Sequence, residues 1–335
     1  MERSSKLVAL FIFILLAGSP FAQRPKGSHE IIKPKGYQPP PIAVSSQMNE
    51  LLAKAVQATI DEFKAQNFTQ QDVSATLIVL DDKGGEWKQG DVRGTERIYP
   101  ASVVKLFYMA ALERQIEDGK VTVTPELERG LRDMIVDSSN EATQYILDVL
   151  TDTSSGAELP TKRFEAWQYK RNRVNRFFAS MGYENINVNQ KTFCEDAYGI
   201  EQQSRNYKGE NRNMLTTDAV ARLLAEIVSG RIADKQRTAE MMTLLHRDPF
   251  AKGADDDQAH AFTGRMLIDR KLTGAKIWSK AGWTSKTRHD AAYLEMPDGS
   301  KFVLVTFTVD HANDTGFIPA LAGKVLDALM KLEHH

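Results

Sequence analysis

Cysteine is almost absent from this chain, because Cys194 is the single cysteine in 335 residues. A lone thiol forms no intramolecular disulfide, so a disulfide scaffold and a cysteine-rich zinc module are both excluded. An excess of one charge is also absent, since 43 basic residues stand against 44 acidic ones and leave a net charge of −1. This balance gives no whole-protein electrostatic reason to bind nucleic acid or an anionic membrane.

Long hydrophobic runs are scarce, and the most apolar one lies at the N-terminus. Leu7–Ala17 covers about half of the ~20 residues that a membrane span needs. Arg3 and Lys6 precede this run, and Ala22 ends a segment suited to cleavage. We therefore predict a secretory signal peptide over residues 1–22, with an uncleaved anchor as the alternative. No cysteine for a lipoprotein anchor follows the run, so we expect a secreted or periplasmic protein without membrane contact after cleavage.

Proline is concentrated in one short stretch rather than spread along the chain. Six of the 12 prolines lie between residues 20 and 41, which indicates a Pro-rich, extended linker over residues 23–44. The catalytic or binding domain is then expected over residues 45–335. A chain with 42% hydrophobic and 26% charged residues is typical of a soluble globular protein. The terminal His334-His335 pair is either native or the remnant of a purification tag, and we assign it no metal role.

Hydrophobic periodicity separates strand-rich ends from a helical middle. Helical spacing runs from Met48 to Phe63 and again over residues 321–332. Residues 125–249 are mostly helical, with a long polar loop at 185–212. Strand patterns occupy residues 75–80, 86–92, 275–282, 290–296 and 301–309.

This order predicts an α+β fold, in the form of an α/β sandwich. The sheet is expected to be mixed, mostly antiparallel and flanked by helices, with strands from residues 45–100 and 265–333. A helical subdomain over residues 101–264 is expected as an insertion between them.

The segment around Ser102 carries the clearest chemical signal. Ser102 is predicted in the first turn of a helix that follows Pro100 and is apolar on nearly every side. Lys105 is the one charge in its first three turns, and a buried ammonium must find partners or lose its proton. Helical spacing puts Lys105 on the face of Ser102, as a base for a serine nucleophile requires. A capping serine with a lysine that reaches to solvent is the structural alternative.

Two further segments accompany this motif. Ser-Ser-Asn begins at Ser138 between two predicted helices, and Lys-Ala-Gly begins at Lys280 near the end of a predicted strand. Taken singly, Ser138 with Glu141 fits a helix-capping box, and Lys280 fits an edge-strand charge. Together and in this order, the three segments resemble the S-x-x-K, S-D-N and K-T-G motifs of class A β-lactamases and penicillin-binding proteins. The resemblance covers roughly residues 45–332 and implies the β-lactamase/transpeptidase-like fold.

The resemblance implies catalytic roles for three of these residues. Ser102 would be the acylated nucleophile, and Lys105 would accept or relay its proton. Ser138 would pass a proton toward the leaving nitrogen. The backbone N–H groups of Ser102 and Trp283 would form the oxyanion hole, where the loss of one donor costs about 100- to 1000-fold in rate.

The resemblance also implies a substrate-binding set. Asn140 would contact a substrate amide and Lys105, and Lys280 would offer positive charge to a substrate carboxylate. The whole set is Asn140, Lys280, Gly282, Trp283 and Thr284.

The chain departs from the family pattern at three points. Ser139 stands where the family has an aspartate that is thought of as structural. Ala281 lacks the hydroxyl that would bind a carboxylate, for which Thr284 or Ser285 are the candidate replacements. The spacing from Ser102 to Ser138 is shorter than in typical class A enzymes, so part of the rim is expected to be missing.

Deacylation is the least defined step. Class A enzymes activate water with a glutamate in a long loop after the second motif, and the corresponding loop here spans residues 189–213. Glu195 is the first candidate, with Glu201 and Asp196 behind it and an ordinary loop acid as the alternative. Without such a glutamate, the acyl-enzyme would turn over slowly.

The leading functional hypothesis is an exported serine hydrolase that opens a β-lactam or related cyclic amide through acyl-Ser102. A peptidoglycan D-Ala-D-Ala peptidase or penicillin-binding protein is the first alternative, and a non-catalytic wall-binding or sensor protein is the second. We expect a monomer that acts on a small β-lactam or peptidoglycan-derived molecule. No cofactor is expected, and no metal either, because no H-E-x-x-H or other ligand spacing occurs.

Overall fold

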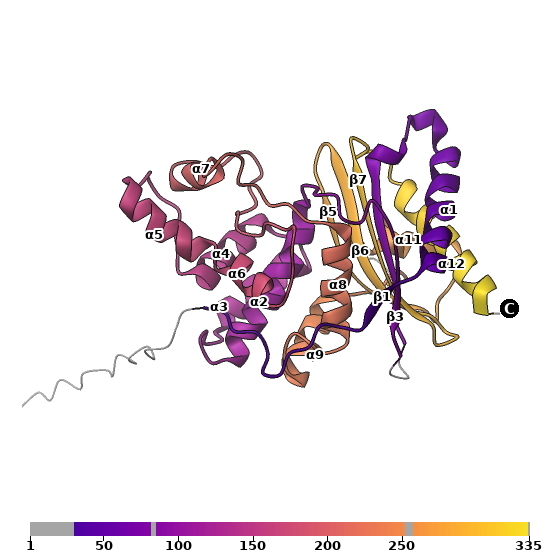
Figure 1. The fold of residues 1–335 in the computed structure, drawn as a ribbon, viewed down its shortest axis with the longest axis horizontal. Coiled ribbons are helices and arrows are strands. Elements are labelled where there is room, and N and C mark those ends of the chain that lie inside the picture. Colours follow the sequence, from indigo (N-terminus) through magenta and orange to yellow (C-terminus); the bar gives the residue numbers. More distant parts are fainter. Residues whose placement is uncertain (1–29, 82–84, 252–256, 334–335) are drawn as a thin grey trace, which may run out of the picture.

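The computed structural model describes residues 30–81, 85–251 and 257–333, and these ranges contain one seven-stranded sheet (Figure 1). The strand order is β1-β3-β2-β7-β6-β5-β4. The β1–β3 pair is parallel and the other pairs are antiparallel. The strands are β1 (Ile42–Val44), β2 (Val73–Val79), β3 (Trp87–Val92), β4 (His246–Arg247), β5 (Lys276–Trp283), β6 (Thr287–Glu295) and β7 (Lys301–Val309). The predicted mixed, mostly antiparallel sheet built from both ends of the domain is confirmed.

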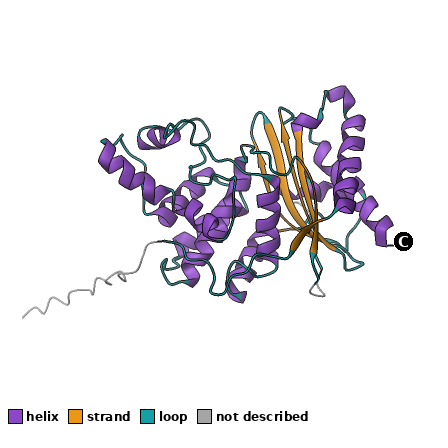
Figure 2. Ribbon diagram, viewed as in Figure 1, coloured by secondary structure: helices purple, strands orange, loops and turns teal. Residues whose placement is uncertain are grey.

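Helices cover both faces of this sheet (Figure 2). One face carries α1 (Ser46–Glu62), α11 (Thr263–Asp269) and α12 (Phe317–Glu333) (Figure 1). The other face carries α8 (Thr217–Val228), beyond which the helical part extends. The helical part contains α2 (Lys105–Glu117), α3 (Pro125–Ile135), α4 (Asn140–Thr151), α5 (Thr161–Arg171), α6 (Arg173–Ser180), α7 (Ile200–Arg205), α9 (Lys235–Leu245) and α10 (Asp257–His260). Short 3₁₀ turns occupy Lys64–Gln66, Gln70–Asp72 and Ala101–Val104.

Side chains of the central strands alternate between two hydrophobic cores. On β7, Val303, Val305 and Phe307 join the core under α2 and α8. Their neighbours Phe302 and Leu304 join the core under α1 and α12. Successive strand residues point to opposite faces, so one strand supplies both cores. The sheet is thereby fixed between the two helical layers, and β5 lies beside the helical part.

The predicted polar loop over residues 185–212 is partly helical. It contains α7 (Ile200–Arg205), which the local pattern did not indicate because its residues are mostly polar. An amide network holds this loop: the Asn213 side chain accepts the N–H groups of Asn189 and Gln190 and donates to the Gln190 carbonyl. Tertiary hydrogen bonds, rather than an apolar stripe, therefore order the segment.

The described part of the predicted linker, residues 30–44, packs against the domain, so ordered structure begins before the predicted boundary at residue 45. Ile31 is buried in the core under α2, and the Tyr37 hydroxyl donates to Glu226 at 2.6 Å. Ile42–Val44 pairs with β3 as strand β1. Proline keeps a chain extended whether it is free or packed, so composition alone does not separate the two. The predicted signal peptide lies outside the described residues. No helix of the described ranges is long and apolar enough to cross a membrane.

Candidate active site

Ser102 lies in a tight turn at the junction of the helical part and the sheet. The helix predicted to start at Ser102 begins instead as the 3₁₀ turn Ala101–Val104, and α2 follows from Lys105. Ala101 has a φ of +46°, a region that costs a non-glycine residue on the order of 1–3 kcal/mol. Backbone strain of this kind is concentrated at functional sites, and here it directly precedes the predicted nucleophile.

Gly282 brings strand β5 against the Ser102 turn. A Cβ atom at Gly282 would lie 2.8 Å from the Ser102 nitrogen and 2.9 Å from the Pro100 oxygen, which is closer than packing allows. Only glycine therefore lets β5 approach this turn so closely. The first and third sequence motifs, far apart in the chain, are in contact, as predicted.

Lys105 is fully buried at the start of α2. Its Nζ donates to the Ser138 carbonyl oxygen at 2.5 Å, to Ser138 Oγ at 3.3 Å and to Asn140 Oδ1 at 3.0 Å. Burial lowers the pKa of the amine from 10.5 to about 7, against the opposing charges of Glu141 and Cys194. An amine with this pKa exists in both protonation states near neutral pH, as a general base requires.

Ser138 lies between two buried lysines. Its φ of +57° is left-handed, and this turn aims both its carbonyl and its hydroxyl at Lys105. The hydroxyl also accepts a hydrogen bond from Lys280 Nζ at 2.9 Å. A hydroxyl that bridges two amines is suited to relay a proton between them and a substrate atom.

Lys280 is also fully buried, and its Nζ is directed at protein acceptors. It donates to Gln258 Oε1 at 2.6 Å, to Ser138 Oγ at 2.9 Å and to the Ala281 carbonyl at 2.9 Å. An ammonium has three N–H bonds, so these acceptors match its donors in number. The structure thus places Lys280 in the site as the residue that orients Ser138.

The departure at Ser139 has a structural explanation. Ser139 is the N-cap of α4, and its Oγ accepts the backbone N–H of Ala142 at 3.1 Å. Serine and aspartate both cap helices well, so the substitution preserves the start of α4. Asn140 is the first residue of that helix and points its Oδ1 at Lys105 and its Nδ2 at Cys194 Sγ, 3.5 Å away.

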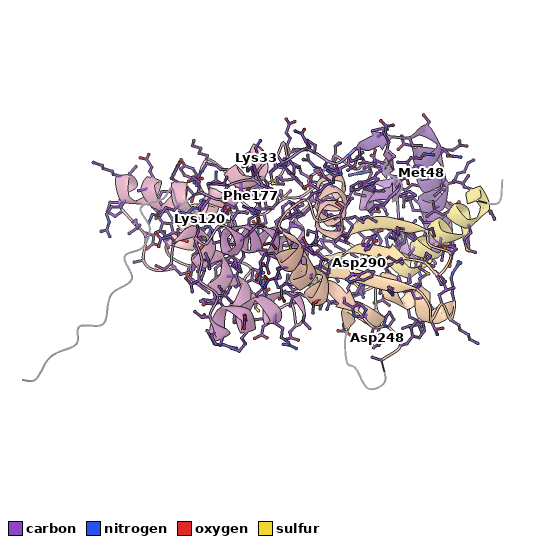
Figure 3. All side chains as sticks on the ribbon, turned by 90° about the horizontal axis from the view of Figure 1, so that it is seen from below. Lys33, Met48, Lys120, Phe177, Asp248 and Asp290 are labelled. Atoms are coloured by element: carbon purple, nitrogen blue, oxygen red, sulfur yellow. The ribbon has the colours of Figure 1, made fainter. Side chains whose placement is uncertain are left out.

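Ala281, the departure in the third motif, has apolar neighbours on one side and an acid on the paired strand. Ala281 packs with Phe262 and Ile318 in a small apolar cluster and pairs across the strands with Asp290. Asp290 lies inside the sheet part (Figure 3), where burial raises its pKa and Oδ1 makes no hydrogen bond to any described residue. An apolar contact beside a buried acid offers no donor to an anion.

Thr284, proposed to compensate for Ala281, is exposed in the turn between β5 and β6. Its Oγ1 accepts the N–H groups of Lys286 and Thr287, both at 3.1 Å. The hydroxyl therefore stabilises the turn. Trp283 is 43% exposed and its ring lies tilted by 40° against Phe262, with 5.7 Å between the ring centroids, so the ring is available at the rim.

The acids proposed for deacylation occupy different environments. Glu195 is exposed in the loop, and no hydrogen bond among the described residues joins it to Lys105, Ser138 or Asn140. Glu201 is buried and forms a bidentate pair with Arg171 at 2.6 and 2.8 Å. These contacts lower the pKa of Glu201 against the effect of burial, so this carboxylate is a structural anion.

Asp196 is also paired, since it accepts from the Ala197 N–H at 2.8 Å and forms an ion pair with Arg205 at 2.5 Å. Glu195 remains the candidate base by elimination among the three, and its role stays a prediction.

Sequence reasoning missed two buried residues that support the site. Gln258 accepts from Lys280, and His289 Nε2 lies 3.0 Å from the Tyr99 carbonyl, three residues before Ser102. Neither residue belongs to a motif. For His289, its place opposite Gly282 on β6 is a register that emerges only when the sheet is paired.

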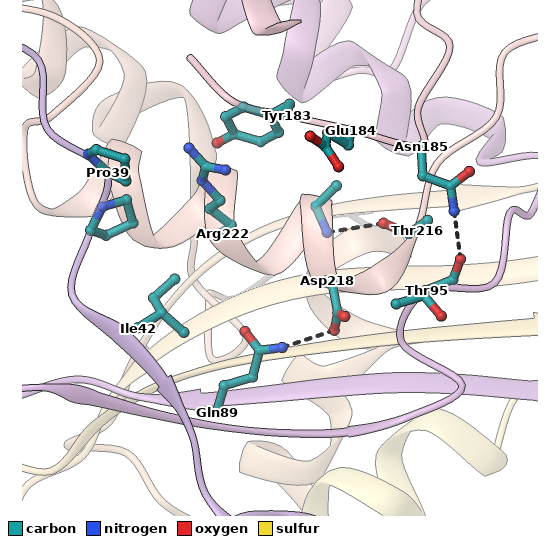
Figure 4. Close-up of a pocket in the computed structure, with 12 residues that line it drawn as sticks. Pro39, Ile42, Gln89, Thr95, Tyr183, Glu184, Asn185, Thr216, Asp218 and Arg222 are labelled. Carbon is teal, nitrogen blue, oxygen red and sulfur yellow. Dashed lines mark hydrogen bonds between the residues drawn. The ribbon is translucent and has the colours of Figure 1, made fainter.

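A pocket of about 420 Å³ lies elsewhere, between β3, α8 and the segment before β1 (Figure 4). Its lining includes Gln89, Asp218 and Arg222 but no residue predicted for the Ser102 site. The Arg222 guanidinium already donates to Glu226, the Tyr37 hydroxyl and two backbone carbonyls. In the described ranges, no group of three His, Cys, Asp or Glu residues is arranged to hold a metal ion.

Solved structures with the same fold include β-lactamases and PBP-A. The β-lactamase from Sphaerobacter thermophilus DSM 20745 is 21% identical, with 84% of this chain and 97% of that chain covered and a TM-score of 0.57. PBP-A is 19% identical, with 88% and 100% covered and a TM-score of 0.59. A class A β-lactamase of the last common ancestor of Gram-negative bacteria is 15% identical, with 85% and 100% covered and a TM-score of 0.55. No curated protein sequence matches the chain.

These structures define the class as the β-lactamase and penicillin-binding protein fold. The model of the beta-lactamase enzyme family matches residues 51–329, most of the chain. The protein belongs to the beta-lactamase enzyme family.

Proposed function

We propose that the protein is an exported serine hydrolase that opens a β-lactam or related cyclic amide through an acyl-Ser102 intermediate. The observation that carries this proposal is the buried Lys105 amine with a pKa of about 7, held by Ser138 and Asn140 at the start of the Ser102 helix. A serine hydroxyl is a weak nucleophile until such a base takes its proton.

In the proposed acylation, neutral Lys105 removes the proton from Ser102 Oγ as the oxygen bonds to the carbonyl carbon of the amide. The resulting oxyanion is bound by the backbone N–H groups of Ser102 and Trp283. Ser138 then transfers its proton to the leaving nitrogen as the C–N bond breaks, and it regains a proton from one of the two lysines it contacts. The contacts of Lys105 and Lys280 with Ser138 Oγ, at 3.3 and 2.9 Å, support this route.

In the proposed deacylation, water attacks the ester carbon and restores Ser102. Glu195 is the proposed base, because Glu201 and Asp196 already form ion pairs. Export, by cleavage after Ala22, is likewise part of the proposal. Sequencing of the mature N-terminus tests it, and a retained residue 1 would contradict it.

A penicillin-binding protein or peptidase is the second candidate, because Glu195 forms no hydrogen bond with Lys105, Ser138 or Asn140 in the described ranges and because Ala281 lacks a hydroxyl. PBP-A shares the fold, and one of its mutants is described as an acyl-enzyme complex with penicillin-G. The substrate would then be a small peptidoglycan-derived peptide, with acylation retained and slow release.

Incubation with a reporter penicillin followed by intact-mass measurement separates these functions. A transient adduct with rapid product release supports the hydrolase, and a persistent adduct supports the penicillin-binding protein. Absence of both an adduct and a product would support the non-catalytic wall-binding protein instead. In Ser102→Ala the adduct should vanish, and an adduct that survives this change contradicts the assignment of the nucleophile.

A further inference from the structure

Gln258 is a buried glutamine at the seam between the helical part and the sheet. It lies on the short helix α10 (Asp257–His260) and is 3% exposed. An amide side chain at such a depth must satisfy its polar atoms, or it destabilises the fold. Its contacts therefore show what the residue holds in place.

Both ends of the Gln258 amide are used twice. Oε1 accepts from Lys280 Nζ at 2.6 Å and from the Ala281 backbone N–H at 3.1 Å. Nε2 donates to the carbonyl oxygens of Ile135 at 3.3 Å and Val136 at 2.8 Å. A glutamine amide offers two acceptor positions and two donors, and each has a partner here.

These contacts fix the orientation of the amide. A flipped amide would set NH₂ against the Lys280 ammonium and an oxygen against two carbonyl oxygens. The Gln258 amide therefore bridges two segments in one direction only. One segment is the end of α3, which leads into Ser138, and the other is β5 at Lys280.

The bridge bears directly on the Ser138 hydroxyl. Lys280 Nζ, held by Gln258, donates to Ser138 Oγ at 2.9 Å. The carbonyl of Val136, held by the same amide, lies two residues before Ser138. The Gln258 side chain thus positions both the donor, Lys280 Nζ, and the segment that carries the acceptor, Ser138 Oγ.

We propose that Gln258 is a positioning residue for acylation, which keeps the Lys280 ammonium aligned on the Ser138 hydroxyl. The proposal rests on the proposed serine hydrolase function and assigns a role within that same site. Because the Gln258 amide accepts a hydrogen bond from Lys280, and Lys280 donates to Ser138, its effect on the reaction passes through these two residues.

Arg247 on β4 offers a matched comparison. It also ties α3 to β5, since its guanidinium donates to the Ile135 carbonyl at 3.1 Å and to the Ser279 carbonyl at 3.2 Å. A guanidinium has no acceptor, so Arg247 cannot accept a hydrogen bond from the Lys280 ammonium as Gln258 does. Arg247→Lys therefore weakens a structural bridge between α3 and β5 but keeps the Gln258–Lys280 hydrogen bond. Gln258→Met weakens a bridge between the same elements and also removes that hydrogen bond.

Charged groups lie on the elements packed around β5: Lys105 on α2, Asp290 on β6 and Arg247 on β4. All of them are retained when Gln258 is replaced by methionine. Methionine has a similar length but no strong acceptor, so the Lys280 ammonium loses one partner. Hydrogen bonds to charged groups are worth about 1.5–3 kcal/mol, so loss of the Gln258 acceptor makes the charged form of Lys280 less favourable than in wild type.

The test measures acylation by a reporter penicillin across pH for wild type, Gln258→Met and Arg247→Lys. In Gln258→Met we expect an acylation rate at least about tenfold lower at neutral pH, a KM within about threefold of wild type, and an alkaline limb moved down by about one pH unit. Arg247→Lys should lower the rate without moving the alkaline limb.

An unshifted alkaline limb in folded Gln258→Met, or an equal shift in Arg247→Lys, overturns the role of Gln258. If Gln258→Met does not fold, Gln258→Asn takes its place, since its amide is too short to span both segments. Failure of both variants to fold also counts against the proposal, because it makes Gln258 a stability residue. No acylation of the wild type overturns the proposed function itself and this inference with it.

Discussion

The two walls of the Ser102 site differ in how firmly they are built. On one wall, Lys105 and Lys280 are fully buried, and the Nζ atom of each donates to Ser138 over distances of 2.5–3.3 Å. On the other wall, Cys194 and Glu195 are exposed in the loop. Within the described ranges, the hydrogen bond that joins these two residues to Lys105, Ser138 or Asn140 is the weak Asn140–Cys194 contact at 3.5 Å. The comparison teaches that one wall is ordered by buried hydrogen bonds, whereas the proposed deacylating base on the other wall, Glu195, is exposed to solvent. Under the proposed function, formation of the acyl-enzyme would therefore have ordered support that its release lacks.

The largest effect is expected from Lys105→Met, which removes the base from the buried wall. General-base catalysis contributes about 100- to 10,000-fold, so the single-turnover acylation rate should fall by about 1000-fold. Lys191→Met is the control, because Lys191 is another nearly buried lysine of the helical part and is paired with Asp148 at 2.6 Å. If both variants fold and lose the acylation rate equally, the position of Lys105 beside Ser138 does not explain the loss. Removal of any buried lysine would then have the same effect.

A smaller effect is expected from Glu195→Gln, which changes the exposed wall alone. Acylation should be unchanged while hydrolysis of the ester slows by about 100-fold, so that the adduct accumulates in the mass spectrum. Asp196→Asn, which alters a neighbouring acid already paired with Arg205, serves as the control. Turnover that is unaffected by Glu195→Gln would place the deacylating base elsewhere.

The buried wall should also be sensitive to acid. Burial lowers the pKa of His289 from 6.5 to about 4. Between pH 4 and pH 6.5, this histidine is therefore mostly protonated in the unfolded chain and mostly neutral in the folded chain. The contribution of this group to stability is therefore lost as pH falls from 6.5 to 4, by about 3 kcal/mol.

Urea unfolding at pH 6.5 and at pH 4 measures this loss. His289→Gln, which keeps a polar side chain near the Tyr99 carbonyl, should lose less stability over the same interval than wild type. An equal loss in both proteins would mean that other groups account for the acid sensitivity.

Much of this architecture was predictable because it follows from hydrophobic periodicity and from short sequence motifs. Helical spacing with one interior charge predicts a buried Lys105, and it is fully buried. The resemblance of the three motifs to the family implies that Ser102, Ser138 and Lys280 share one site, and contacts join their segments in the structure. These features depend on periodicity and on motifs, which a sequence carries directly.

Other features depend on tertiary contacts that no local pattern carries. The four hydrogen bonds of Gln258 exist only when α10, α3 and β5 meet. The extended segment before Ser45 has the composition of a linker, yet Ile31 is buried in a core. Thr284 was proposed to replace a lost hydroxyl, but the structure uses it in a turn.

The pH dependence of acylation tests the central claim most directly, namely that an uncharged, buried Lys105 activates Ser102. The single-turnover acylation rate with a reporter penicillin should rise as Lys105 loses its proton, with an apparent pKa of about 7. The rate should level off above that value before any alkaline decline. A rate that is constant from pH 5 to 8, or that climbs only near the ordinary lysine value of 10.5, would contradict the account.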